Sequence, residues 1–333
     1  MRMRKWIYMA LLLIGFAVLM PGFLQSQQGD APVEDTVFFD KEELPSFRIV
    51  ADVSMVSVPV TVRKADGSFY RGLTEKSFRI KEDGKDQEII FFAEEGLPTH
   101  IAIVLDISGS VRPEWGTIKQ ATKRFIEYFR PDDSFSLTTF NNEIRLRMDW
   151  GKKTDQVDAV LTSVYCKDET KLWDAVWVVA TQVFDGIDGK KAIIIMTDGM
   201  DNQSAASYTD AVRAAVENGI AIYIVSKTEA LRQHYEYLYP DGVPQRYFAQ
   251  AEAILRRLAY DTGGRVLQPN NFGQLNDIYD EVSEELRNQY TLGYISTNMA
   301  KDGSYREINV GVSTQDARNV TITARPGYYA PRR

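Results

Sequence analysis

Short hydrophobic runs alternate with amphipathic stretches through the middle of the chain. Residues 100–105, 191–196 and 220–225 are almost continuously apolar, as expected of strands that are buried on both faces of a sheet. Stretches with a helical period lie between and after them, including 114–129 and 274–289. Strands and helices that alternate in this way predict an α/β fold, a Rossmann-like open and mostly parallel sheet with helices on both faces.

Antiparallel β patterning flanks this α/β region on both sides. Before it, hydrophobic and polar residues alternate over 56–62, and Asp-Gly pairs at 66–67 and 83–84 mark hairpin turns. Pro59 falls inside the first of these strands and predicts that the strand lies at a sheet edge, because proline cannot donate to a ladder. After the α/β region, strands are predicted over 290–296, 305–312 and 320–324.

Neither flanking β segment has enough strands to be stable by itself. We therefore expect residues 47–96 and 290–333 to pack together as one small β-sandwich-like domain. The α/β domain, residues 97–289, is then inserted into it.

The first 26 residues have the pattern of an export segment. Arg2, Arg4 and Lys5 precede a nearly uninterrupted apolar stretch, 6–20, and polar residues follow. This predicts a signal peptide or an N-terminal anchor, with the rest of the chain in the periplasm, in the cell envelope or secreted. Residues 27–46 are polar and acidic, with two prolines, and predict a linker.

Charge and the scarcity of cysteine and histidine narrow the function classes. The net charge of the 333 residues is −7, and loss of the three cations within 1–26 changes it to −10, so no nucleic-acid partner is expected. Cys166 is the only cysteine, which excludes an internal disulfide and a multi-cysteine metal site. His100 and His234 are the only histidines, so few zinc or serine-hydrolase sites can be built.

Oxygen-bearing side chains gather where the predicted strands end. Asp106, Ser108 and Ser110 follow the first buried strand at alternate positions. Asp198 follows the second buried strand, and Thr170 comes just before a predicted helix. Ligands of open α/β sheets bind beyond the carboxyl ends of the strands, so these five side chains can converge there. Carboxylate and hydroxyl oxygens suit Mg²⁺ or Mn²⁺, and not zinc.

A purely structural interpretation competes with a metal site. Ser108 and Ser110 are able to cap the helix that follows them, and Asp198 is able to begin a turn. Asp201 is expected to be a solvated turn residue, with contact to the metal ligands as the alternative. Asp174 has a similar choice, as an acidic residue that favours the first turn of a helix.

The arrangement resembles the von Willebrand factor A (VWA) domain and its metal-ion-dependent adhesion site. The Asp-x-Ser-x-Ser signature corresponds to Asp106, Ser108 and Ser110, the threonine of the family to Thr170, and its second aspartate to Asp198. The resemblance covers roughly residues 97–289. It implies that the hydroxyl groups contact the metal directly and that the aspartates often act through water.

Five further segments are distributed over both the flanking regions and the α/β region. They are GLTEKSF at 72–78, EDG at 82–84, LAYDTGGR at 258–265, LRNQYTLGY at 286–294 and GYY at 327–329. With these segments, nearly all of residues 47–330 resembles the exported VWFA-related family known from acidobacteria. That family has no assigned enzyme activity or defined partner.

Aromatic residues are frequent between 227 and 250, after a predicted parallel strand. That segment should emerge on the same rim of the sheet as the candidate metal site. Its rings are candidates for a partner-binding rim, since exposed tyrosines favour recognition, and packing onto the body of the protein is the alternative. These residues are Tyr235, Tyr237, Tyr239, Tyr247 and Phe248.

These observations predict an exported VWA-type adhesion or protein-interaction module and no enzyme. A protein ligand would supply an Asp or Glu carboxylate as the last ligand of the divalent cation. Membrane contact is expected only through the N-terminal segment, if that segment stays uncleaved. Two alternatives stay open: a metal-independent scaffold of the cell envelope, and a metal-assisted hydrolase, which lacks a general base beside the proposed site.

Overall fold

The computed structural model describes residues 55–94, 98–127, 129, 131, 133–151, 155–166, 169–226, 245–269, 274–314 and 319–332. All of these belong to one compact unit, Asp52–Arg333. The predicted export segment 1–26, the linker 27–46 and residues 227–244 lie outside the described residues.

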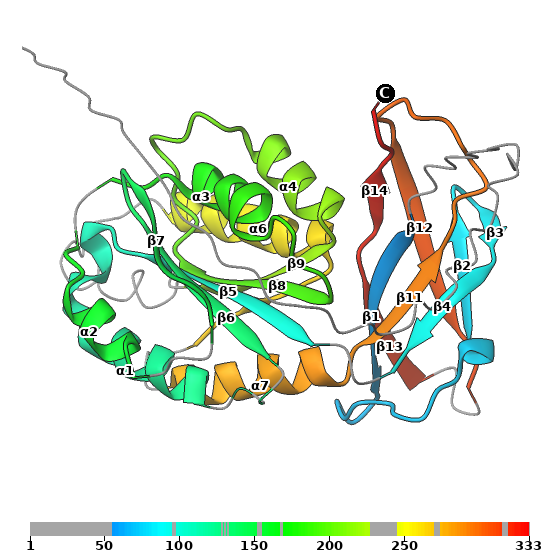
Figure 1. Cartoon of the computed structure of the whole chain (residues 1–333), viewed down its shortest axis with the longest axis horizontal. Helices are drawn as coiled ribbons and strands as arrows, with labels where there is room; N and C mark the ends of the chain where they lie inside the picture. Colours follow the sequence, from blue (N-terminus) through cyan, green and yellow to red (C-terminus); the bar gives the residue numbers. More distant parts are fainter. Residues whose placement is uncertain are drawn as a thin grey trace, which may run out of the picture. The chain divides into compact units, whose positions relative to one another are not determined.

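A six-stranded sheet forms the centre of the α/β region (Figure 1). Its order is β10-β9-β8-β5-β6-β7, and every neighbouring pair is parallel except β6 with β7. The predicted apolar runs form β5, β8 and β9 in the middle of the sheet, where they are almost wholly buried. The strands are β5 (Thr99–Asp106), β6 (Ser134–Phe140), β7 (Ile144–Gly151), β8 (Lys190–Thr197), β9 (Ile220–Ser226) and β10 (Val266–Leu267).

Alternate residues of these strands face two different hydrophobic cores. Ala102 and Val104 of β5 pack in the core that α3, α4 and α6 cover, whereas Ile101 and Ile103 pack beneath α1, α2 and α7. Within the described ranges, no helix combines the length and the apolar character that crossing a membrane requires. The helices are η2 (Gly109–Glu114), α1 (Trp115–Glu127), α2 (Val157–Thr162), α3 (Leu172–Val178) with its π-helical continuation η3 (Val179–Val183), α4 (Tyr208–Glu217), α6 (Gln245–Thr262) and α7 (Leu275–Arg287).

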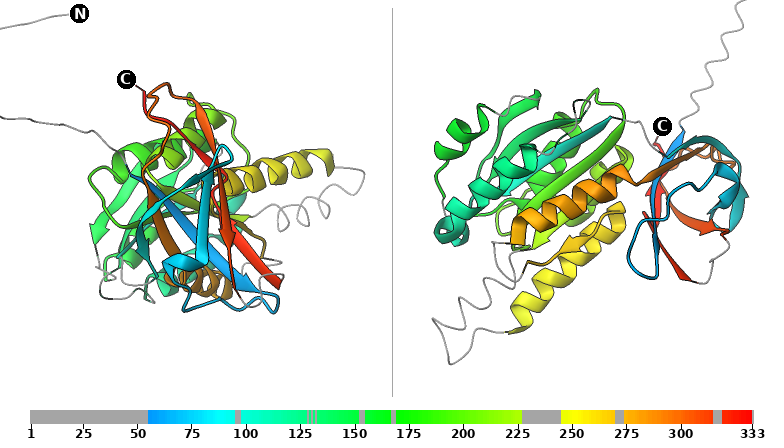
Figure 2. Two further views of the ribbon diagram at one scale, coloured as in Figure 1. Left: turned by 90° about the vertical axis from the view of Figure 1, so that its right-hand side faces the viewer. Right: turned by 90° about the horizontal axis from the view of Figure 1, so that it is seen from below.

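The strands that flank the α/β region interleave in two four-stranded antiparallel sheets, which Figure 2 shows from two sides. One sheet has the order β13-β1-β11-β4 and the other β14-β12-β2-β3. Val58 of β1 lies opposite Leu292 of β11, and Ile80 of β2 opposite Val310 of β12. The elements are β1 (Val56–Lys64), η1 (Glu75–Ser77), β2 (Phe78–Glu82), β3 (Lys85–Gln87), β4 (Ile89–Ala93), β11 (Tyr290–Tyr294), β12 (Tyr305–Val312), β13 (Val320–Ala324) and β14 (Gly327–Tyr329).

The fold class predicted from the sequence is confirmed by this architecture: a mostly parallel α/β sheet with flanking antiparallel sheets. The placing of β1 at a sheet edge is wrong, because β1 pairs with β11 on one side and β13 on the other. Pro59 is tolerated there because the pairing with β13 begins only at Val60. The domain boundaries at 97 and 289 stay predictions.

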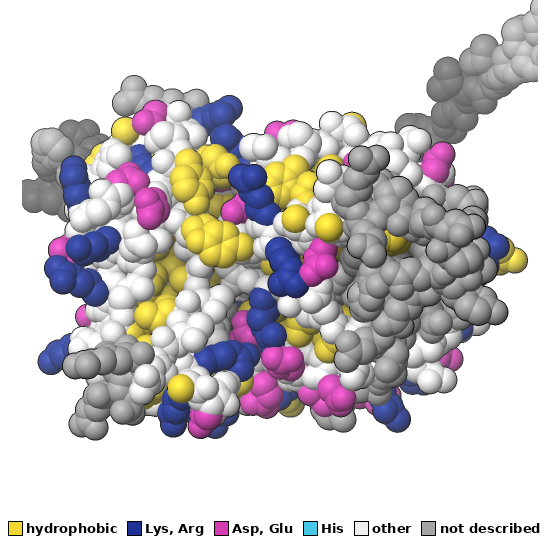
Figure 3. All heavy atoms as spheres, turned by 180° about the vertical axis from the view of Figure 1, so that it is seen from behind, with side chains coloured by type: hydrophobic (Ala, Val, Ile, Leu, Met, Phe, Trp, Pro, Cys, Tyr) yellow, Lys and Arg dark blue, Asp and Glu magenta, His cyan; other side chains and the backbone are white. Residues whose placement is uncertain are grey.

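Charged side chains of both signs share the surface with exposed hydrophobic groups, as the face in Figure 3 shows. Isolated exposed hydrophobic residues are ordinary on a folded protein. Any functional assignment therefore has to come from particular groups of residues.

Candidate metal centre

The centre of the sheet contains a reversal of strand order. From β5 the chain adds β6 and β7 on one side and then places β8, β9 and β10 on the other. At such a switch point the connections leave the two central strands in opposite directions and open a crevice at the carboxyl ends. Asp106 is the last residue of β5, and Asp198 directly follows β8. Both predicted aspartates therefore lie at this crevice.

Asp106 is buried, at 1% exposure, and its carboxylate is held by two donors. The backbone N–H of Ser108 donates to Oδ1 at 2.9 Å, and the hydroxyl of Thr197 donates to Oδ2 at 3.1 Å. The first bond closes an Asx turn, so the residues after β5 bend back toward the carboxylate. Orientation of Asp106 thus comes from both of the strands that flank the crevice.

Ser108 is also buried, at 4% exposure, and lies at the N-cap of η2. Its hydroxyl makes no capping hydrogen bond to that helix within the described residues. Ser110 is the second residue of η2, and only its backbone is described.

Asp198 repeats the local geometry of Asp106. It is 4% exposed, and its Oδ1 accepts the N–H of Met200 at 3.1 Å, again two residues further on. Gly199 between them has φ +80°, and a Cβ there would lie 2.7 Å from a side-chain carbon of Leu255. The turn that orients Asp198 therefore requires glycine at 199. The Thr197 hydroxyl, which donates to Asp106, also accepts the N–H of Gly199 at 3.2 Å. It therefore connects Asp106 to the turn that contains Asp198.

Thr170 is brought to the same edge by the loop that follows Asp198. Its N–H donates to Asn202 Oδ1 at 3.1 Å, and its carbonyl accepts the Asn202 N–H at 3.2 Å. The next residue, Lys171, donates its N–H to the carbonyl of Asn141 in the β6–β7 turn. Thr170 is 5% exposed and is fixed by loops from two other strands. The sequence offered no signal for Asn202 in this role, because the bond joins separate loops.

Asp201 has a structural role that the sequence interpretation missed. It was expected to be a solvated turn residue, but its Oδ1 accepts the N–H of Leu172 at 2.7 Å, in the first turn of α3. Asp174, expected only to favour a helix terminus, accepts the N–H groups of Ala205 and Ala206. Together these carboxylates join the start of α3 to the loop after Asp198, and so help to place Thr170.

The aromatic rim predicted between 227 and 250 is only partly within the described residues. Tyr235, Tyr237 and Tyr239 lie outside them, and of Tyr247 only the backbone, in α6, is described. Phe248 is 5% exposed, so its inclusion in an exposed rim is wrong: the ring is buried within the protein.

An exposed tyrosine that the sequence interpretation missed lies near the crevice. Tyr165 is 82% exposed and lines a shallow pocket of about 150 Å³ together with Ile107, the residue after Asp106. Arg145 and Arg147 of β7 line the same pocket. A tyrosine beside two arginines is a composition typical of protein-binding surfaces.

The donor set at the crevice fits a hard divalent cation. It combines two carboxylates with hydroxyl groups, which are oxygen ligands of the kind that Mg²⁺ and Mn²⁺ take. Among the described residues, no group of three or more His, Cys, Asp or Glu side chains is placed to hold a metal.

Comparison with protein families gives a match that covers more than half of the chain. The family model of the von Willebrand factor type A domain matches residues 100–281. A comparison with curated proteins gives no match.

Comparison with solved structures gives weaker similarities. An aerotolerance-related membrane protein from Bacteroides fragilis is 18% identical, with a TM-score of 0.44, over 56% of this chain and 98% of that one. The conserved hypothetical protein BatB from Bacteroides thetaiotaomicron is 17% identical, with a TM-score of 0.41, over the same shares. Proximal thread matrix protein 1 from the mussel byssus, with a zinc-occupied MIDAS motif, is 17% identical, with a TM-score of 0.45, over 62% of this chain and 49% of that one.

Proposed function

This chain belongs to the von Willebrand factor type A domain family, and we propose that it is an exported module that binds a protein ligand through a divalent cation. The ion is Mg²⁺ or Mn²⁺. Residues 1–26 direct the chain out of the cytoplasm. Mass spectrometry of the mature protein would show whether they are cleaved.

One observation supports the proposal most directly. Two buried aspartates, Asp106 and Asp198, end adjacent parallel strands at the point where the strand order reverses, and each is held by the N–H two residues later. A buried carboxylate is stabilised by hydrogen bonds or by a cation, because burial without either is costly. Thr197 supplies one such hydrogen bond to Asp106, and a divalent cation at this edge of the sheet would stabilise both carboxylates further.

The hydroxyl groups of Ser108, Ser110 and Thr170 would hold the ion directly, and the aspartates would act through water, as the family resemblance implies. This leaves a coordination position for a carboxylate from a partner. Tyr165 with the arginines of β7 would then contact the surface around that carboxylate. An acidic partner and this acidic chain would otherwise repel each other, so the cation also removes an electrostatic barrier to association.

Isothermal titration of the purified chain with Mg²⁺ and Mn²⁺ tests the metal site. Asp106→Asn and Asp198→Asn keep the shape of each side chain and remove its charge, so we expect each to weaken binding by at least about tenfold. Asp86→Asn is a matched control, because that aspartate is exposed on β3 and pairs with Arg79 at 2.5 Å. Absence of binding in the unmutated chain, or equal binding in all three variants, would refute the site.

Ligand capture distinguishes a metal-dependent module from a metal-independent scaffold. Cross-linking and pull-down from an envelope extract should recover a partner with Mg²⁺ and lose it with EDTA or with Asp106→Asn. Recovery of the same partner under all three conditions would favour the scaffold. Turnover of an ester or phosphate substrate that depends on Mg²⁺ would favour the hydrolase instead.

A further inference from the structure

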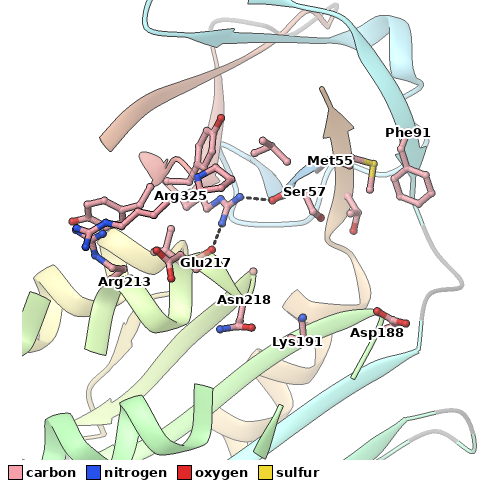
Figure 4. Close-up of a pocket in the computed structure, with 18 residues that line it drawn as sticks. Met55, Ser57, Phe91, Asp188, Lys191, Arg213, Glu217, Asn218 and Arg325 are labelled. Carbon is pink, nitrogen blue, oxygen red and sulfur yellow. Dashed lines mark hydrogen bonds between the residues drawn. The ribbon is translucent and has the colours of Figure 1, made fainter. Parts of the chain in front are cut away.

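A second site lies at the opposite ends of the same parallel strands. A pocket of about 840 Å³ opens beside the start of β8 and the α4–β9 connection, where they meet β1, β11 and the β13–β14 segment (Figure 4). This volume is within the range of pockets that bind small organic molecules. Because the candidate metal centre is at the carboxyl ends of β5 and β8, the two sites occupy different edges of the sheet.

The pocket has an excess of positive charge in a chain whose net charge is negative. Two acidic side chains line it, Asp188 and Glu217, against four basic ones. The basic residues are Lys191, Arg213, Arg325 and Arg332. A concave surface with this excess favours anions, since low-dielectric walls strengthen the field inside it.

Arg325 is the most unusual of these residues, because it is buried without a carboxylate. It is 6% exposed, and its two terminal nitrogens donate to the carbonyl oxygens of Val216 at 2.7 Å and Ser57 at 2.8 Å. Among the described residues, its buried Nε has no hydrogen-bond partner. Burial lowers the pKa of Arg325 to about 10, so the group stays charged at neutral pH. Its guanidinium carbon also lies 5.9 Å from the ring centroid of Tyr328, but neutral carbonyls and a ring compensate a buried charge less than a carboxylate does.

Arg325 has N–H groups left after its two bonds to carbonyl oxygens. A guanidinium has five N–H groups, and the two carbonyls engage one on each terminal nitrogen. The Nε–H and a neighbouring terminal N–H form a side-on pair that suits carboxylate or phosphate. In Figure 4, Lys191 lies across the pocket from Arg325, on β8. Burial lowers the pKa of Lys191, in keeping with its place in the pocket wall.

The other walls are apolar and aromatic. Met55, Phe91 and Val216 line the pocket, and so does Tyr328. Arg213 packs over the ring of Tyr329, with its guanidinium carbon 4.1 Å from the ring centroid, so that cation is already held in place. An occupant therefore needs an anionic head for Arg325 and Lys191 and an apolar body for these walls.

We propose that this pocket binds a small organic anion, with a carboxylate or phosphate head on an apolar body, independently of the metal centre. The head contacts Arg325, Lys191 on the opposite wall strengthens the positive field around it, and the apolar body packs between Met55, Phe91 and Tyr328. The site joins the α/β region to the flanking sheets, so its ligand contacts both.

Isothermal titration of the full chain in EDTA tests this proposal with matched probes. We expect 3-phenylpropionate or phenyl phosphate to bind and the neutral 3-phenylpropanamide not to bind. Comparison of the affinities of the two anions shows whether a carboxylate or a phosphate head is preferred. Lys191→Met should weaken binding several-fold, because the pocket loses one of its four basic side chains. Lys85→Met, on the exposed strand β3, is the matched control and should bind like the unmutated chain.

Arg325→Lys keeps the charge and removes the side-on pair of donors, so we expect it to weaken binding at least as much as Lys191→Met. If Arg325→Lys lowers the melting temperature too far for titration, the proposal is tested with Lys191→Met and Arg332→Gln, at least one of which should weaken binding of the anion. The proposal is overturned if neither anion binds, if the amide binds as tightly as the carboxylate, or if the Lys191 and Arg332 variants both bind like the control. Binding that is unchanged by Asp106→Asn separates this site from the candidate metal centre.

Discussion

A buried carboxylate on α7 links the flanking sheets to the α/β region, and its removal should destabilise the whole fold. Glu285 is 1% exposed and accepts hydrogen bonds from Arg63 of β1 at 2.8 Å, Arg265 at 2.5 Å and the Tyr223 hydroxyl at 3.2 Å. Glu285→Gln removes the charge and replaces one acceptor oxygen with an amide donor. Arg63 and Arg265 both bond the same oxygen, Oε2, so the substitution leaves two guanidinium groups beside a neutral side chain.

The expected loss of stability follows from how buried each partner is. Removing one member of a fully buried ion pair costs about 3–5 kcal/mol, whereas an exposed pair contributes about 0–1 kcal/mol. The Arg63 and Arg265 side chains are 23% and 29% exposed, so water can solvate them partly once the carboxylate is gone. We therefore expect Glu285→Gln to lower the free energy of unfolding by about 2–3 kcal/mol.

Urea unfolding followed by circular dichroism measures this change. Glu281→Gln is the matched control, because Glu281 also pairs with Arg265, at 2.7 Å, but is 49% exposed and should cost less than about 1 kcal/mol. In a double-mutant cycle, Arg63→Met should cost less in the Glu285→Gln background than in the unmutated chain. Equal losses for the two glutamate variants, or an equal cost of Arg63→Met in both backgrounds, would refute this reasoning.

Three further predictions concern the packing around the two sites. Gly264→Ala should lower the free energy of unfolding by about 1–3 kcal/mol in urea, because a Cβ there would collide with the backbone carbonyl of Ile222. Asp201→Ala removes the acceptor at the start of α3 and should cost about 1 kcal/mol, with weaker Mg²⁺ binding by titration; unchanged values for both would contradict its positioning role. The fragment 97–289 should unfold in one cooperative transition at a lower urea concentration than the full chain, because it lacks Arg325 and the flanking sheets; failure to fold would count against the predicted boundary.

Local pattern was sufficient for most of the elements. The predicted strands 305–312 and 320–324 coincide with β12 and β13, and the apolar runs form the central strands of the sheet. The same reasoning placed Asp106 and Asp198 after two buried parallel strands. These features depend on hydrophobic periodicity and on residues close together in the sequence, so the sequence alone is enough to predict them.

Other features depend on contacts between distant segments. The sequence did not reveal that β1 has partners on both sides, that Asn202 holds Thr170, or that Glu285 bonds an arginine 222 residues away. It gave no sign that Arg325 is buried against the end of α4. A period specifies which face of a strand or helix is buried, but not which segment covers that face. The sequence by itself thus determined the elements and the candidate metal donors. Tertiary packing decided the sheet partners, the residues that hold Thr170 and the burial of Arg325 in the second pocket.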